Sequence, residues 1–80
     1  MEIDRIISWF DKSSEKLIGE LDVNHIQLSS LEEIFNPPKN DPMMYNPYNI
    51  DIKIGKKIKE IIEIEFNFEK FVYQIDCFQK

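Results

Sequence analysis

Residues 28–50 read LSSLEEIFNPPKNDPMMYNPYNI, and this stretch decides how the rest of the chain is divided. Ser30, with Glu33 three residues later, fits a capping box, in which the serine oxygen accepts from a free backbone N–H and the glutamate reaches back to the cap. The pattern predicts a short helix near residues 31–36. The Pro37-Pro38 pair ends it, because both residues lack the N–H that a continuing helix would need.

Beyond this pair the chain enters a loop that two further prolines shape. Pro42 and Pro47 each fix one backbone angle and bias the residue before them toward extended geometry. The loop is nevertheless rich in large side chains, which either fold back onto the core or form an aromatic patch for a partner. Folding back is the more common use, and it is the interpretation we favour. The side chains concerned are Met43, Met44, Tyr45 and Tyr48.

The clearest amphipathic pattern follows the loop. Asp51 is a suitable N-cap, and isoleucines at helical spacing predict a helix over residues 52–64 with its lysines mostly on the other side. Apolar and polar residues alternate after it, so we place Asn67 in a turn. The last apolar run predicts a strand over residues 70–78.

The residues before the central stretch predict a hairpin. Residues 3–10 and 16–23 are short apolar runs joined by a polar cluster suited to a turn. Together the patterns predict a single α+β domain over residues 1–80, in the order β-β-α-α-β. Its three-stranded antiparallel sheet is expected to carry both helices packed on one face.

Charge and composition restrict the function. The 80 residues carry 15 acidic and 10 basic side chains, which gives a net charge of −5. An acidic chain is a poor match for a nucleic-acid backbone and a plausible match for a basic protein. Residues 1–51 hold ten of the acids and only four of the bases, so acidic surface is expected mostly there. No run is long and apolar enough to span a membrane, and no signal peptide is apparent, so we expect a cytoplasmic protein.

No group of residues predicts catalysis, a metal or a cofactor. His25 is the only histidine and Cys77 the only cysteine, so neither has the additional ligands that a metal site requires. A nucleophilic pair could be built only from these two, and a strand position already accounts for Cys77 as a small apolar residue. Gly19 and Gly55 stand alone, which excludes a phosphate-binding glycine loop. We therefore expect a protein that is not an enzyme.

The order of parts along nearly the whole chain resembles a family of small bacterial proteins. A start like IISWFDKSSEKLIGEL, followed by LSSLEEIF, DPMMYNPYNI, a helix and an aromatic strand, is similar to immunity proteins of contact-dependent growth inhibition and related polymorphic toxin systems. The chain departs from the pattern by an inserted Met44 and by Phe71-Val72-Tyr73 near the last strand's start. The matching positions are Leu31, Phe35, Asp41, Pro42, Met43, Tyr45 and Tyr48.

The resemblance implies inhibition by binding, with no turnover. A toxin domain, often a nuclease such as a tRNase with a basic substrate groove, would be met one to one by an acidic protein that covers or blocks the groove. An aromatic anchor with an acidic rim is the expected design. The candidate partner-binding residues are Glu32, Asp41, Tyr45 and Tyr48.

Two other functions remain open. A structural or regulatory module that associates with itself through an edge strand would give the same composition. A small enzyme is the third hypothesis, and it would depend on His25 or Cys77.

Overall fold

The N-terminal hairpin forms as predicted in the computed structural model, which describes residues 2–79. Strand β1 (Ile3–Asp11) pairs antiparallel with β2 (Leu17–Asp22). The carboxylate of Asp11 accepts from the backbone N–H groups of Ser13 and Ser14 at 2.7 and 3.0 Å, which closes the turn between the strands.

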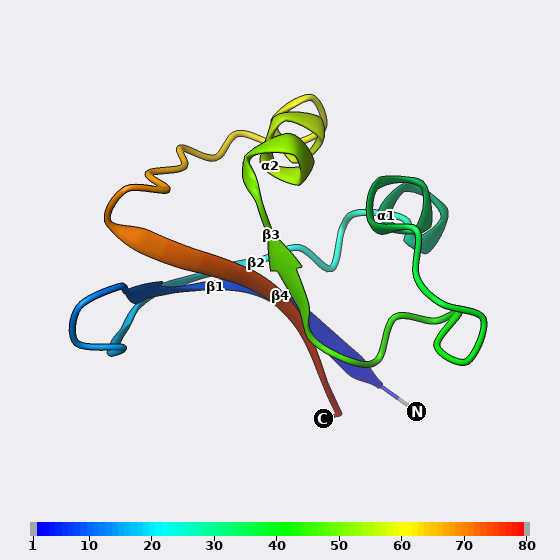
Figure 1. The fold of residues 1–80 in the computed structure, drawn as a ribbon. Coiled ribbons are helices and arrows are strands. Elements are labelled where there is room, and N and C mark those ends of the chain that lie inside the picture. Colours follow the sequence, from blue (N-terminus) through cyan, green and yellow to red (C-terminus); the bar gives the residue numbers. More distant parts are fainter. Residues whose placement is uncertain (1, 80) are drawn as a thin grey trace.

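The sheet has four strands, so the predicted three-stranded sheet is wrong. Strand β4 (Phe71–Gln79) pairs along the whole of β1, and the short β3 (Tyr48–Ile50) pairs with the other side of β4. The strand order is β2-β1-β4-β3, and the elements follow the chain as β-β-α-β-α-β (Figure 1). Three residues are too few to show an alternating pattern, and β3 becomes a strand only through its pairing with β4.

Helix α1 (Leu28–Phe35) begins earlier than predicted, and its predicted capping box is wrong. Gln27 is the N-cap and its side chain makes no capping hydrogen bond, while Ser30 lies inside the first turn and donates its N–H to the Gln27 carbonyl at 3.1 Å. The end of the helix is confirmed. Asn36 takes a left-handed conformation with φ 50° and donates its N–H to the Glu32 carbonyl, immediately before the prolines.

Helix α2 (Ile52–Lys59) has the predicted cap and ends before residue 64, so the predicted end is wrong. The Asp51 carboxylate accepts from the Ile54 N–H at 2.8 Å. After the helix, the chain turns and runs without regular structure to β4, and its apolar side chains pack partly against the core. The backbone N–H of Asn67 donates to the Tyr73 hydroxyl at 2.9 Å, which ties this segment to the sheet; Asn67 opens the predicted turn.

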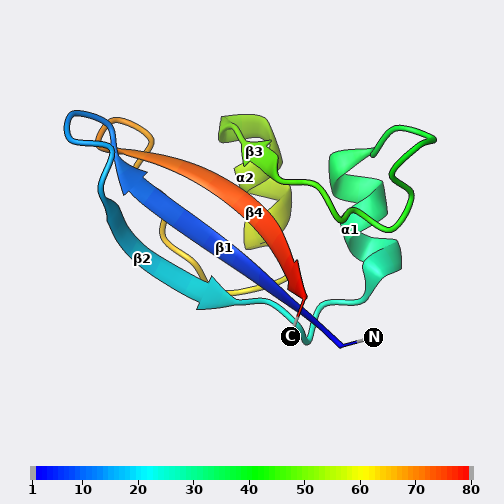
Figure 2. The same ribbon diagram turned by 90° about the horizontal axis from the view of Figure 1, so that it is seen from below.

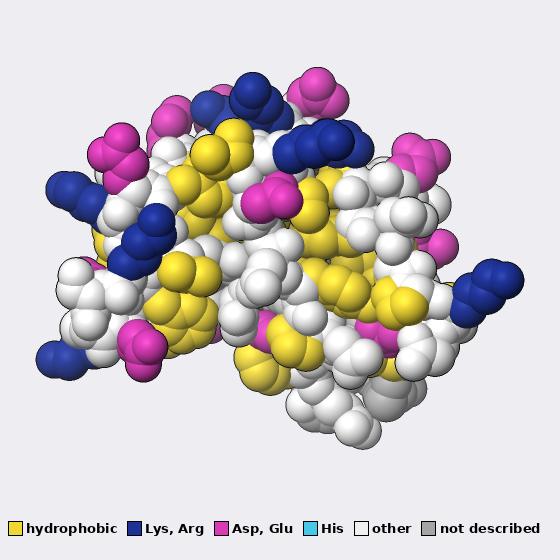
Figure 3. Space-filling view, viewed as in Figure 1, with side chains coloured by type: hydrophobic (Ala, Val, Ile, Leu, Met, Phe, Trp, Pro, Cys, Tyr) yellow, Lys and Arg dark blue, Asp and Glu magenta, His cyan; other side chains and the backbone are white. Residues whose placement is uncertain are grey.

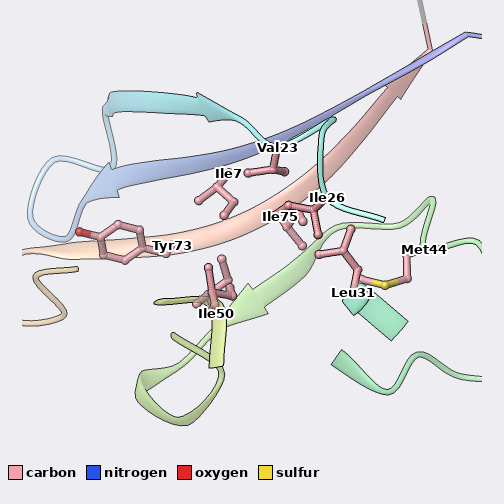
Figure 4. Packing of buried hydrophobic residues seen from close by; sticks show 9 residues of the cluster. Ile7, Val23, Ile26, Leu31, Met44, Ile50, Tyr73 and Ile75 are labelled. Carbon is pink, nitrogen blue, oxygen red and sulfur yellow. The ribbon is translucent and has the colours of Figure 1, made fainter. Parts of the chain in front are cut away.

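Both helices lie on one side of the sheet, as predicted (Figures 1 and 2). The core fills the space between them and the strands (Figure 4). A fully buried aliphatic side chain contributes about 1.5–3 kcal/mol relative to an exposed one, so this single layer supplies most of the stability. The core residues are Ile7, Val23, Ile26, Leu31, Met44, Ile50, Ile58, Tyr73 and Ile75.

The opposite side of α2 is solvated. Lys56, Lys57 and Lys59 are exposed, and basic and acidic side chains mix at the end of the molecule where α2 lies (Figure 3). Neither helix in the described part of the chain has the length and apolar character needed to cross a membrane.

Candidate functional site

The loop between α1 and β3 is organised around Asp41. This carboxylate accepts from the backbone N–H groups of Tyr45 and Asn46 at 2.9 and 3.1 Å and from the Tyr48 hydroxyl at 2.5 Å. Asp41 is only 6% exposed, so its oxygens face the interior of the loop. The loop is therefore held closed by its own acidic residue.

Arg5 of β1 contacts the same loop. It is 9% exposed, and its Nη2 donates to the Met43 carbonyl at 2.5 Å. Met44, next along the chain, has a left-handed φ of 55° and is 2% exposed, so its side chain joins the core. Sequence reasoning missed Arg5, although a charged residue in phase with Ile7 on the apolar face of a strand was a visible signal.

The charges in the loop shift two pKa values in opposite directions. The pKa of Asp41 lies below its usual value, first because the Tyr48 hydroxyl donates to the carboxylate, with further contributions from the backbone donors and from the positive charge of Arg5. Burial, and then the same hydrogen bond, raise the pKa of Tyr48 to about 12. At neutral pH the pair is therefore an ionised carboxylate and a neutral phenol.

This arrangement predicts an acid-sensitive loop. The folded chain holds the Asp41 pKa below the ordinary value of 3.8, so this group's stabilisation is complete above that pH and is lost as the pH falls through the lowered pKa. Asp41→Asn removes the ionisable group. Urea unfolding at about pH 6 should therefore show a lower stability for the variant than for the unaltered chain. Between about pH 6 and about pH 3, the variant should lose less stability than the unaltered chain does. An unchanged acid dependence would contradict the assignment.

Tyr48→Phe removes the hydroxyl that donates this hydrogen bond to Asp41. The raised pKa of Tyr48 means that its contribution is complete below its ordinary pKa of 10.0 and is lost as the pH rises toward 12. The variant should therefore lack this loss of stability at alkaline pH. It should also lose part of the acid dependence, because its hydroxyl is the largest cause of the low Asp41 pKa.

The structure separates the four sequence-predicted partner residues. Asp41 and Tyr45 lie in the loop, and Tyr48 follows it as the first residue of β3, where its hydroxyl reaches Asp41. The Tyr48 ring also packs near Phe35, with 5.9 Å between centroids. Asp41 and the Tyr48 hydroxyl serve the fold of the loop. Tyr45, 44% exposed, and Glu32, exposed on α1, are the two that are free to meet a partner.

The prediction that the large loop side chains fold back is half confirmed. Met44 is buried and Tyr48 is half-buried, but Met43 and Tyr45 remain 45% and 44% exposed. Tyr45 borders a mainly apolar hollow of about 300 Å³ together with Ile3, Cys77 and Gln79. The loop therefore leaves an apolar surface at one end of the sheet.

His25 and Cys77 are not brought together into a site. His25 is exposed between β2 and α1, whereas Cys77 lies half-buried on β4, opposite Arg5 on β1. Within residues 2–79, no group of three or more His, Cys, Asp or Glu side chains is placed to hold a metal ion.

A second apolar hollow, of about 620 Å³, opens where β3, the start of α2 and the start of β4 meet. Ile52, Phe68 and Phe71 are among its walls, and Lys12 and Lys53 stand beside it. This combination can hold an apolar group.

A family model matches most of the chain. Residues 4–76 match a family model described as "Domain of unknown function (DUF7683)". No curated protein matches the chain. The matched range runs from β1 into β4, so it includes both helices and the loop.

Proposed function

This chain belongs to the DUF7683 family, a domain family of unknown function, and we propose that it is an immunity protein that binds a cognate toxin domain and neutralises it. Binding would be one to one and would take place in the cytoplasm. Inhibition would follow from covering the toxin's active surface, with no chemical step performed by this chain.

One structural observation supports this proposal most directly. The residues that carry the resemblance to immunity proteins form one connected unit: Leu31 lies in the core, Phe35 packs near Tyr48, and Tyr48 donates to Asp41. The unit ends in two large side chains that the fold leaves exposed, Met43 and Tyr45. A rigid loop that displays apolar side chains loses little conformational entropy on binding, which favours tight association.

The charge of the chain supports the same function. A net charge of −5 accelerates encounter with a basic protein such as a nuclease and disfavours direct binding to nucleic acid. Glu32 and Tyr45 are the two candidate residues whose exposure leaves them free to meet a partner.

The test is a calorimetric titration of this chain with the toxin domain encoded immediately upstream of its gene. We expect one-to-one binding with a Kd on the order of nanomolar or below, about −12 kcal/mol. The matching assay is growth of cells that express the toxin domain with and without this chain. No heat at micromolar concentrations, together with no protection, would overturn the proposal.

A second candidate function has a specific observation in its favour. Strand β2 is an edge of the sheet, and Leu17 and Ile18 are 52% and 51% exposed there. Open strand edges with apolar side chains are sites for pairing with a second copy. A molecular mass that rises with concentration in light scattering, without any toxin domain, would favour such a self-associating module.

A further inference from the structure

The sheet has one face that the helices do not cover. We call it the outer face, and Figure 2, seen from below, shows β1, β2 and β4 in front with α1 and α2 behind them. Strand register identifies its members, because residues directly opposite one another in an antiparallel pair share a face. The outer face consists of Asp4, Ile6, Ser8 and Phe10 of β1; Leu17, Glu20 and Asp22 of β2; Asn49 of β3; and Val72, Gln74, Asp76 and Phe78 of β4.

The outer face is more apolar than a solvated face should be. A sheet with one covered side normally alternates, with apolar residues inward and polar residues outward. Here Phe78, Leu17 and Val72 point outward and are 51%, 52% and 44% exposed. Contiguous exposed apolar surface on a small domain commonly marks an interaction site.

Three of these apolar residues, Phe10, Leu17 and Val72, lie together at one end of the outer face, whereas Phe78 lies at the other end, opposite Asp4. Phe10 lies between Leu17 on β2 and Val72 on β4, where the register shift of β2 inserts Ile18 as an extra residue. A hollow of about 310 Å³ opens here, and Phe10 and Val72 are among its walls. This hollow has room for an apolar side chain of a partner.

The other part of the outer face is acidic. Asp22, Ile6 and Asp76 stand in a row across three strands, with Glu20 and Asp4 on neighbouring positions. Since adjacent strands lie about 4.8 Å apart, the two aspartates of this row are about 10 Å apart with an isoleucine between them. Within the described strands, the outer face carries four acids and no lysine or arginine.

Amide groups from the chain itself hold these carboxylates in place. The Asn24 side chain donates to Asp4 at 2.5 Å, its backbone N–H donates to Asp22 at 2.8 Å, and the Gln74 side chain donates to Asp76 at 2.8 Å. Amides fix the position of a carboxylate and leave its negative charge uncompensated. The acids are thus oriented while their charge is available to a cationic partner.

We propose that the outer face is where a basic protein domain docks, with the acids pairing with its lysines or arginines and the apolar end receiving one of its apolar side chains. The proposal rests on the proposed function, because the partner is the toxin domain. Charge complementarity selects this occupant. If a second copy of the chain docked through the same face, its four acids would lie against these four and the like charges would repel. Nucleic acids and anionic membranes are also negatively charged and would be repelled in the same way.

This location differs from that of Glu32 and Tyr45. Tyr45 borders Ile3, Cys77 and Gln79, which lie on the helix side of the sheet, and Glu32 is on α1. Substitutions on the two sides can therefore decide which one meets the toxin domain.

The experiment uses two charge-matched double variants. Asp22→Lys with Asp76→Lys reverses two acids of the outer face, and Glu32→Lys with Glu33→Lys reverses two exposed acids of α1. Circular dichroism first establishes that each is folded, and each is then titrated with the toxin domain encoded upstream. We expect the outer-face variant to raise the Kd at least about 100-fold, as for loss of charge pairs near the centre of an interface. The α1 variant should change it less than about threefold, as for rim charges.

Val72→Ser examines the apolar end without altering charge. It should weaken binding about tenfold or more if the hollow receives an apolar side chain. Equal losses from both double variants, or a larger loss from the α1 variant, would overturn the outer-face proposal and leave the immunity function standing. No binding by the unaltered chain would overturn both.

Discussion

Ile58→Ala should lower the free energy of unfolding by about 2–5 kcal/mol, which is the usual cost of removing a buried isoleucine and leaving a cavity. Ile58 is 1% exposed and, with Gly55, is one of the two buried residues of α2. An eight-residue helix is too short to be stable alone, so its attachment to the sheet depends on buried contacts, of which Ile58 makes the largest. Because a small domain has about 5–15 kcal/mol in total, the loss would be a large fraction. Urea unfolding followed by circular dichroism measures it.

The control is the same substitution in the same helix at an exposed position. Ile52 is 59% exposed, and Ile52→Ala should change stability by no more than about 0.5 kcal/mol. Similar losses from the two variants would show that burial of Ile58 does not hold α2 on the sheet.

Gly19→Ala is expected to cost about 1–3 kcal/mol, as overpacking does. A Cβ at this position would lie 2.3 Å from Cζ2 of Trp9. Trp9 is the residue directly opposite Gly19 on the neighbouring strand β1, and its indole lies over the glycine. The ring also packs near Tyr73, with 5.8 Å between centroids, so it cannot move away without loosening the core. If only the backbone mattered, alanine would leave the stability unchanged or raise it. A loss of stability must therefore come from the clash with the Trp9 ring.

A double-mutant cycle isolates this contact. In a Trp9→Leu background the smaller side chain leaves room for the new methyl, and Gly19→Ala should then cost much less than in the unaltered chain. If the cost is the same in both backgrounds, the indole is not the reason that glycine is needed.

The two faces of the sheet contribute differently to stability. The inner face supplies the buried core, and the losses expected at Ile58 and Gly19 arise there. Exposed substitutions on the outer face should stay within about 0.5 kcal/mol of the unaltered chain. A variant such as Val72→Ser should therefore keep its fold, so that any loss of binding can be assigned to the surface.

Local chemistry determined much of this protein. Asp51 caps α2, Asn36 and the prolines end α1, and the Asp11 carboxylate closes the hairpin turn, because each of these effects acts within a few residues of the chain. The long strands β1 and β4 were also predictable, since each has enough β-branched and aromatic residues to show its preference. The α+β class followed from these parts.

Tertiary contacts decided the rest. Strand β3 exists because β4 offers it a partner. Asp41 is a loop anchor because Tyr48 folds back to donate to it and because Arg5, from the other end of the chain, places a positive charge nearby. The acids and apolar residues of the outer face come from separate strands and meet only through their register. Sequence spacing records neighbours along one strand or helix, whereas the face of a sheet is made by neighbours across strands, so only the folded sheet could reveal it.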